Sequence, residues 1–97
     1  MSDPKQVVTH ALLLCRRTVP KPLFDSVHRQ VLERAPELEH ATPYTVEMIC
    51  GEDYWDPLNK VTRRQVGLIM AHLVDAGLVS FRFISPRNAK PLWYVLE

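Results

Sequence analysis

The hydrophobic positions between residues 62 and 76 recur with the period of an α-helix. Their spacing of three and four places a single apolar stripe on one face of that helix, composed of Val66, Ile69, Met70, Leu73 and Val74. Thr62 and Gln65 have the spacing of a capping box, which predicts that the helix begins at Thr62. Gly77 predicts its end, because glycine takes the left-handed conformation at little steric cost. The opposite face carries Arg64, Leu68, Ala71 and Asp75, flanked by Arg63, Gly67 and His72.

After Gly77 the pattern changes to the alternation of β-strands. Val79, Phe81 and Phe83 alternate with Ser80, Arg82 and Ile84, and a second apolar run covers residues 92–96. These runs predict a hairpin joined by the turn SPRNAK, residues 85–90. The turn contains Arg87, Asn88 and Lys90 and no acid, which suits a loop that lies along a phosphate backbone.

Two more helices are predicted in the middle of the chain. The first begins at Pro22 or Leu23 and ends near Arg34, and its expected buried residues are Leu23, Phe24, Val27, Val31 and Leu32. The second begins at Thr42-Pro43, with threonine as cap and proline at the first helical position, and ends at Gly51. Its expected inward residues are Val46, Ile49 and Cys50. A very short strand is expected within residues 36–41.

The N-terminal residues 1–18 predict a further helix that starts at Asp3-Pro4. Its apolar face would contain Val7, Val8, Ala11, Leu12 and Leu14. Such a helix either packs on its own domain or forms the seam of a dimer. Because the core is already filled by Phe24, Val31, Ile49, Val66, Leu73, Phe81 and Trp93, we expect a homodimer seamed partly by this helix. Light scattering on the parent and a Leu12→Glu variant tests this.

Together these elements predict one domain over residues 1–97, mainly α with a C-terminal β-hairpin, an α+β fold. The longest uninterrupted apolar runs have five residues, so no membrane span is expected. The N-terminus lacks the pattern of a secretory signal, and a cytoplasmic protein is expected. Cys15 and Cys50 are then expected to be reduced, buried thiols.

The net charge of +1 hides a strong polarity along the chain. Residues 1–21 contain four Lys/Arg and one acid, residues 22–59 contain two and eight, and residues 60–97 contain six and two. The two ends are therefore basic and the middle is acidic. This polarity fits a protein oriented on DNA, and it equally fits an acidic face that binds a basic partner.

Catalytic and metal chemistry finds little support in the sequence. The four histidines are scattered, no Cys/His spacing resembles a zinc site, and there is no glycine-rich phosphate loop. Glu52, Asp53 and Asp56 cluster in a loop, where acids are more often solvated than catalytic, and no nucleophile is near them in sequence. We therefore expect no enzyme activity, no metal and no cofactor.

Gly67 and Leu68 each allow two interpretations. A glycine inside a helix costs about 1 kcal/mol relative to alanine. Close packing against another element, such as Trp55, is the preferred reason, and close approach to DNA is the other. Leu68 can touch a thymine methyl group or anchor a protein interface.

The pattern VTRRQVGLIMAHLVDAGLVSFRFI, residues 61–84, resembles the recognition helix and first wing strand of winged helix-turn-helix regulators. The resemblance covers residues 22–97 and leaves residues 1–18 outside. GEDYWDPL followed by RRQVG also resembles small regulators of bacteriophages and other mobile elements. The resemblance implies that the helix 62–76 and the turn 85–90 bind double-stranded DNA. The implied DNA-binding residues are Lys60, Arg63, Arg64, Leu68, Arg87, Asn88 and Lys90.

The alternative is a protein-interaction module, such as an antirepressor or inhibitor. It would bind another regulator through the acidic middle or the outer face of the helix 62–76.

Arg63 and Arg64 lie outside the apolar stripe, so their replacement is expected to weaken DNA binding while leaving the thermal midpoint nearly unchanged.

Overall fold

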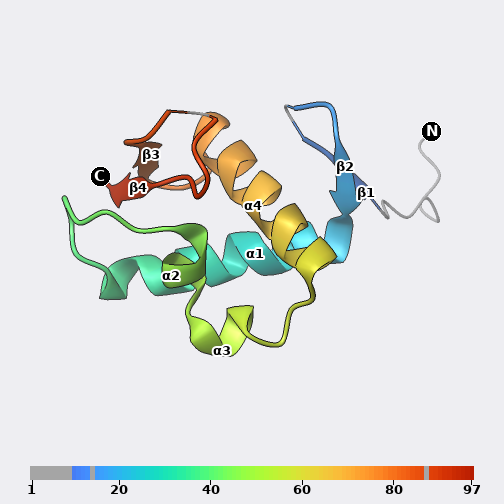
Figure 1. The fold of residues 1–97 in the computed structure, drawn as a ribbon, viewed down its shortest axis with the longest axis horizontal. Coiled ribbons are helices and arrows are strands. Elements are labelled where there is room, and N and C mark those ends of the chain that lie inside the picture. Colours follow the sequence, from blue (N-terminus) through green and yellow to red (C-terminus); the bar gives the residue numbers. More distant parts are fainter. Residues whose placement is uncertain (1–9, 14, 87) are drawn as a thin grey trace, which may run out of the picture.

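The computed structural model describes residues 10–13, 15–86 and 88–97, and the first element of this part is a β-hairpin (Figure 1). Strand β1 (His10–Leu12) pairs antiparallel with β2 (Thr18–Pro20). The helix expected for residues 1–18 is therefore wrong where the chain is described, and residues 1–9 and 14 lie outside that part. A short apolar run does not distinguish helix from strand by its period. Here the hairpin buries Leu13 and Val19 in the core, and this packing decides between them.

Helix α1 (Lys21–Arg34) confirms the predicted second helix, with proline in its first turn. Val27 and Val31 are fully buried, whereas Leu23 and Phe24 are half-buried at the edge of the core. Leu32 was expected inside but is 52% exposed, because it lies about 100° around the helix from Val31. A single 3-10 turn, η1 (Ala35–Glu37), follows α1.

Helix α2 (Val46–Cys50) begins later than the Thr42-Pro43 start that the sequence predicts. Tyr44 is extended and bridges Tyr94, with two backbone hydrogen bonds of 2.8 Å. Because those backbone groups are used across strands, the helix can begin only after them. Thr45 is its cap, and the Oγ1 of Thr45 accepts a hydrogen bond from the backbone N–H of Met48 at 3.4 Å. Gly51 ends α2 as expected, with φ 91°.

A short helix, α3 (Glu52–Trp55), occupies the segment expected to be a link. Trp55 and Leu58 pack against the core, as predicted. Polar side chains of α1 hold this region in place. Gln30 Nε2 donates to Cys50 O at 2.7 Å, Arg34 Nε donates to Ile49 O at 3.1 Å, and the hydroxyls of Ser26 and Tyr54 lie 2.8 Å apart. The two α1 donors thus satisfy carbonyls at the end of α2, which its own ladder leaves free.

Helix α4 (Lys60–Asp75) begins two residues before the expected position. Asn59 is the cap, since its Oδ1 accepts a hydrogen bond from the Thr62 N–H at 2.8 Å. The capping box predicted at Thr62 is therefore wrong. The predicted end is confirmed: Gly77 has φ 70°, and the Leu78 N–H reaches back to Leu73 O at 2.9 Å, as in a Schellman motif.

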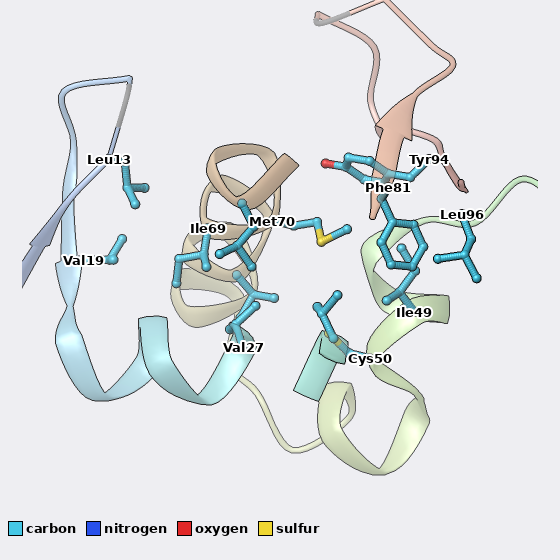
Figure 2. Packing of buried hydrophobic residues seen from close by; sticks show 13 residues of the cluster. Leu13, Val19, Val27, Ile49, Cys50, Ile69, Met70, Phe81, Tyr94 and Leu96 are labelled. Atoms are coloured by element: carbon cyan, nitrogen blue, oxygen red, sulfur yellow. The ribbon is translucent and has the colours of Figure 1, made fainter. Parts of the chain in front are cut away.

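The hydrophobic core lies where α1 and α4 pack together, with a hairpin at each side (Figure 2). The predicted α4 stripe is confirmed, because Val66, Ile69, Met70 and Leu73 are fully buried and Val74 is half-buried. The other buried members are Leu13, Val19, Val27, Val31, Ile49, Cys50, Phe81, Tyr94 and Leu96. Cys50 is inside as expected, whereas Cys15 is exposed, because it lies in the turn of the first hairpin.

The predicted C-terminal hairpin is confirmed in shorter form as β3 (Phe81–Phe83) and β4 (Tyr94–Leu96). The far edge of β4 carries isolated bridges to His40 and Tyr44, so all three β4 residues are buried. Trp93 was expected in the core but is half-buried, since it lies just before β4, whose residues are the ones buried in the core. Over the described residues the fold is a small α+β domain with four α-helices and two antiparallel hairpins.

Candidate functional site

The outer side of α4 forms a ridge opposite the buried stripe. Arg64 and Leu68 lie along its middle, because four residues advance the helix by about one turn. Arg64 is exposed and Leu68 is half-buried. A groove runs along each side of this ridge, and both residues contribute to the walls of both grooves. We refer to them as the loop-side groove and the hairpin-side groove.

The loop-side groove lies between α4 and the loop that joins β3 to β4. It encloses about 420 Å³. Its walls contain Val46, Trp55, Arg63, Arg64, Gly67, Leu68, Ala71, Asn88, Ala89, Lys90, Pro91, Leu92 and Tyr94. Most of these side chains are apolar, and Arg64 and Lys90 are its exposed cations. This chemistry suits a ligand with an apolar surface bordered by negative charge.

Arg63 is engaged within the protein. Its guanidinium carbon lies 5.4 Å from the centroid of the Trp55 ring, and its Nη2 donates to Asp56 O at 3.2 Å. The Nε of Arg63 is buried and has no hydrogen-bond partner among the described residues. Arg63 thus fastens α4 to the turn after α3, whereas the guanidinium of Arg64 takes part in none of the side-chain hydrogen bonds or ion pairs between described residues.

Gly67 lies open in the wall of the loop-side groove. A Cβ at this position would meet no described atom within 4 Å beyond its chain neighbours and the backbone of its own helix. The expected reason for this glycine, close packing against another element, is therefore wrong. Leu68 packs partly against the core, and it also lines both grooves.

The other predicted site residues lie at the start of α4 and in the β3–β4 loop beside it, as far as the structure describes them. Lys60 is exposed in the first turn of α4. Asn88 and Lys90 are exposed in the β3–β4 loop and line the loop-side groove. Arg87 lies outside the described residues. The fold thus brings Arg63, Arg64 and Leu68 of α4 together with Asn88 and Lys90, which are about 20 residues further along the chain.

The hairpin-side groove brings in residues that the sequence analysis did not assign to a site. It encloses about 460 Å³ between the turn of the first hairpin and the first half of α4. Its walls contain Arg16, Arg17, Thr18, Val19, Val61, Arg64, Gln65 and Leu68. Arg16 and Arg17 fall within residues 1–18, for which the sequence predicts a helix. The adjacent Thr18-Val19-Pro20, with two β-branched residues, is the sequence signal that favours a strand instead.

Charge is separated over the surface as it is along the chain. Every charged residue that lines the loop-side or hairpin-side groove, as far as the structure describes them, is a lysine or arginine. Glu52 and Asp53 instead line a separate groove of about 310 Å³ with Gln30 and Arg34. The two grooves beside the α4 ridge therefore carry positive charge, which favours an anionic partner.

Two titratable groups away from the grooves, Cys50 and Tyr54, have pKa values raised by burial. Burial raises the pKa of the Cys50 thiol from 9.0 to about 12, despite the nearby Arg34 charge. Burial likewise raises the pKa of Tyr54, and its hydrogen bond to Ser26 acts in the opposite direction. Within the part of the chain that the structure describes, no three or more His, Cys, Asp or Glu side chains gather as a metal site would require, and none of the helices could span a membrane.

Comparisons with known proteins gave no match, whether the chain was compared with family models, with curated proteins or with solved structures. The proposed function therefore rests on the two grooves and the ridge between them.

Proposed function

We propose that this protein is a sequence-specific DNA-binding regulator with a winged helix-turn-helix arrangement. The order of elements supports the fold: α1, an extended residue at Tyr44, α2, α4, and the β3–β4 hairpin. The bridge between Tyr44 and Tyr94 supports it further, since it places a third extended segment beside the hairpin. In this arrangement α4 is the recognition helix and the β3–β4 loop is the wing.

The observation that carries the proposal is the exposed Arg64 on the α4 ridge, beside small residues. Gly67 and Ala71 line the same groove, and their size leaves room for a base edge close to the helix. An arginine side chain that has no partner among the described residues can form two hydrogen bonds to the O6 and N7 of a guanine. Leu68, one turn along the ridge, would contact a thymine methyl group.

The wing contacts the phosphate backbone in this proposal. Lys90 and Asn88 are exposed on the loop, across the groove from α4. Contacts to phosphates fix the orientation of a protein on DNA and carry no sequence information of their own. Lys90 therefore contributes to affinity for every sequence, whereas Arg64 contributes to choice among sequences.

Selection from random double-stranded DNA, followed by binding measurements at two salt concentrations, tests the function. Arg64→Ala should weaken binding to the selected site by roughly 1–3 kcal/mol and reduce the preference for it. Lys90→Ala should weaken binding to all sequences alike and lower the salt slope by about one unit. Arg29→Ala is the matched control, because Arg29 is exposed on α1 and lines neither groove. Equal effects of Arg64→Ala and Arg29→Ala, or no selected sequence, would contradict the proposal.

A homodimer remains part of the proposal, since two copies would present two α4 helices to two half-sites. The helical seam expected for residues 1–18 no longer supports it. Leu12 on β1 is 69% exposed, so its replacement tests whether this apolar side chain contacts a second copy of the protein. Light scattering should show a dimer for the parent and a soluble monomer for Leu12→Glu, and a monomeric parent ends this part of the proposal.

A protein partner is the second candidate, and the apolar walls of the loop-side groove favour it. Trp55, Leu68 and Leu92 could receive an apolar side chain from an acidic segment of another regulator. Leu68→Glu tests the apolar contact with a protein partner, and Lys90→Ala tests the phosphate contact of the wing. The two variants are therefore measured side by side. Loss of a protein complex in Leu68→Glu, with DNA binding absent from the parent at low salt, would favour the protein partner.

A further inference from the structure

The turn of the first hairpin places Arg16 and Arg17 beside α4, on the side away from the β3–β4 loop. The two grooves share the ridge residues Arg64 and Leu68. Gly67 and Ala71 lie in the loop-side wall, and Val61 and Gln65 lie in the hairpin-side wall. Figure 1 shows α4 between the blue β1–β2 hairpin and the red β3–β4 loop. The cations Arg16 and Arg17 lie on the first of these elements and Lys90 lies on the second.

The hairpin holds its arginines in a defined position. Leu13 and Val19 are buried in the core on either side of the turn. Within the turn, Leu13 N donates to Arg17 O at 2.8 Å and Arg16 N donates to Leu13 O at 2.9 Å. Because the backbone of the turn is fixed at both ends, Arg16 and Arg17 need not be ordered from a free tail when a ligand binds.

The backbone of Arg16 adds a second observation. Arg16 has φ 67°, in the left-handed region that glycine adopts most easily. A long cationic side chain at such a position is conformationally unfavourable, and here it is exposed in the wall of the hairpin-side groove. None of the described residues that line this groove is acidic. The side chain is thus available to an anion from outside the molecule.

We infer that the β1–β2 hairpin is a second DNA-contacting arm, whose Arg16 and Arg17 bind the phosphate backbone on the side of α4 opposite the wing. The inference rests on the proposed function. A helix inserted in the major groove has one backbone strand on each side, across a groove about 12 Å wide. The wing residue Lys90 and the hairpin arginines would then contact opposite strands, so that α4 is clamped in the groove.

Salt dependence of DNA binding provides the main test. Arg16→Gly removes the charge while relieving the positive φ, and Arg17→Gln removes the second charge. The double variant should fold like the parent, weaken binding to selected and unselected DNA by the same factor, and reduce the salt slope by about 0.9 for each lost phosphate contact. Each single hairpin variant is compared with Arg29→Ala, which likewise removes one positive charge. A double variant with the parent's slope and affinity would overturn the inference.

The exposed Cys15 allows the DNA strand beside the β1–β2 hairpin to be mapped directly. An iron chelate attached through a thiol reagent should label Cys15 and leave Cys50, which is only 1% exposed, unmodified. Radical cleavage from Cys15 should cut one strand beside the site. The same chelate on Lys90→Cys, in a Cys15→Ser background, should cut the other strand. Cuts from position 90 alone would overturn the inference.

These outcomes separate the inference from the proposed function. If Arg64→Ala abolishes sequence preference while the hairpin variants bind normally, the proposed function holds and the second arm is wrong. If the parent selects no DNA sequence and binds DNA no better than the Arg64→Ala and Lys90→Ala variants, both are wrong.

Discussion

Arg63 lies over the ring of Trp55, with 5.4 Å between the guanidinium carbon and the ring centroid, and it donates to the carbonyl of the next residue, Asp56, at 3.2 Å. Two neighbouring arginines on α4 thus have different surroundings. Arg63 joins α4 to the turn after α3, whereas Arg64 stands exposed on the ridge. This changes the expectation that both can be replaced without cost to stability.

Arg63→Ala should lower the free energy of unfolding by about 1 kcal/mol. The cation–π contact and the hydrogen bond each contribute roughly 0.5–1.5 kcal/mol, and the unpaired Nε of Arg63 offsets part of this. For a domain of this size, that loss lowers the thermal midpoint by about 4–8 °C. Arg64→Ala should leave the midpoint nearly unchanged. Equal midpoints for the two variants would show that the Trp55 contact does not stabilise the fold.

Asn59→Ala should destabilise the protein by about 1 kcal/mol, because it removes the side chain that caps α4. Thr62→Ala is the control for the capping box that the sequence suggests, and its effect should be smaller. Urea denaturation with an unchanged m-value measures both. A larger loss from Thr62→Ala would mean that the cap is at the later position.

Gly67→Ala should stabilise the protein by about 1 kcal/mol, since the added methyl group meets no described atom within 4 Å beyond its own stretch of helix, and alanine favours the helix. Ala71→Gly, one turn further along the same groove, should have the opposite effect. If α4 enters the major groove, Gly67→Ala should also weaken DNA binding despite the gain in stability. A destabilised Gly67→Ala protein would contradict the open position of this residue.

Cys50 should make stability depend on alkaline pH. Its pKa is raised by burial from 9.0 to about 12, so the folded state retains a proton that the unfolded state loses. The stabilisation is fully present below pH 9 and is lost as pH rises from 9 to 12, by at most about 1.4 kcal/mol per pH unit.

The measurement is the difference between the parent and Cys50→Ala over that range, because other groups titrate there in both proteins. The destabilisation caused by Cys50→Ala should shrink as pH rises above 9. A constant difference would show that the Cys50 thiol is not held protonated by the fold.

Local sequence was sufficient for the elements that depend on near neighbours. The stripe of α4 follows from side-chain spacing alone, and Gly77 ends the helix because a left-handed residue is needed there. The C-terminal hairpin was also predicted, although its strands are shorter than the apolar runs. Arg64 and Lys90 were found as candidates because charge and helical face can be read from the chain.

Tertiary contacts decided the rest. The same apolar run could form helix or strand, and burial of Leu13 and Val19 selected the strand. Tyr44 was drawn out of α2 by its pairing with Tyr94, about 50 residues away in the sequence. The ridge of α4 between two basic grooves depends on Arg16, Arg64 and Lys90, which come from separate segments. No local pattern contains that arrangement, because packing of the two hairpins against the helices brings those segments together.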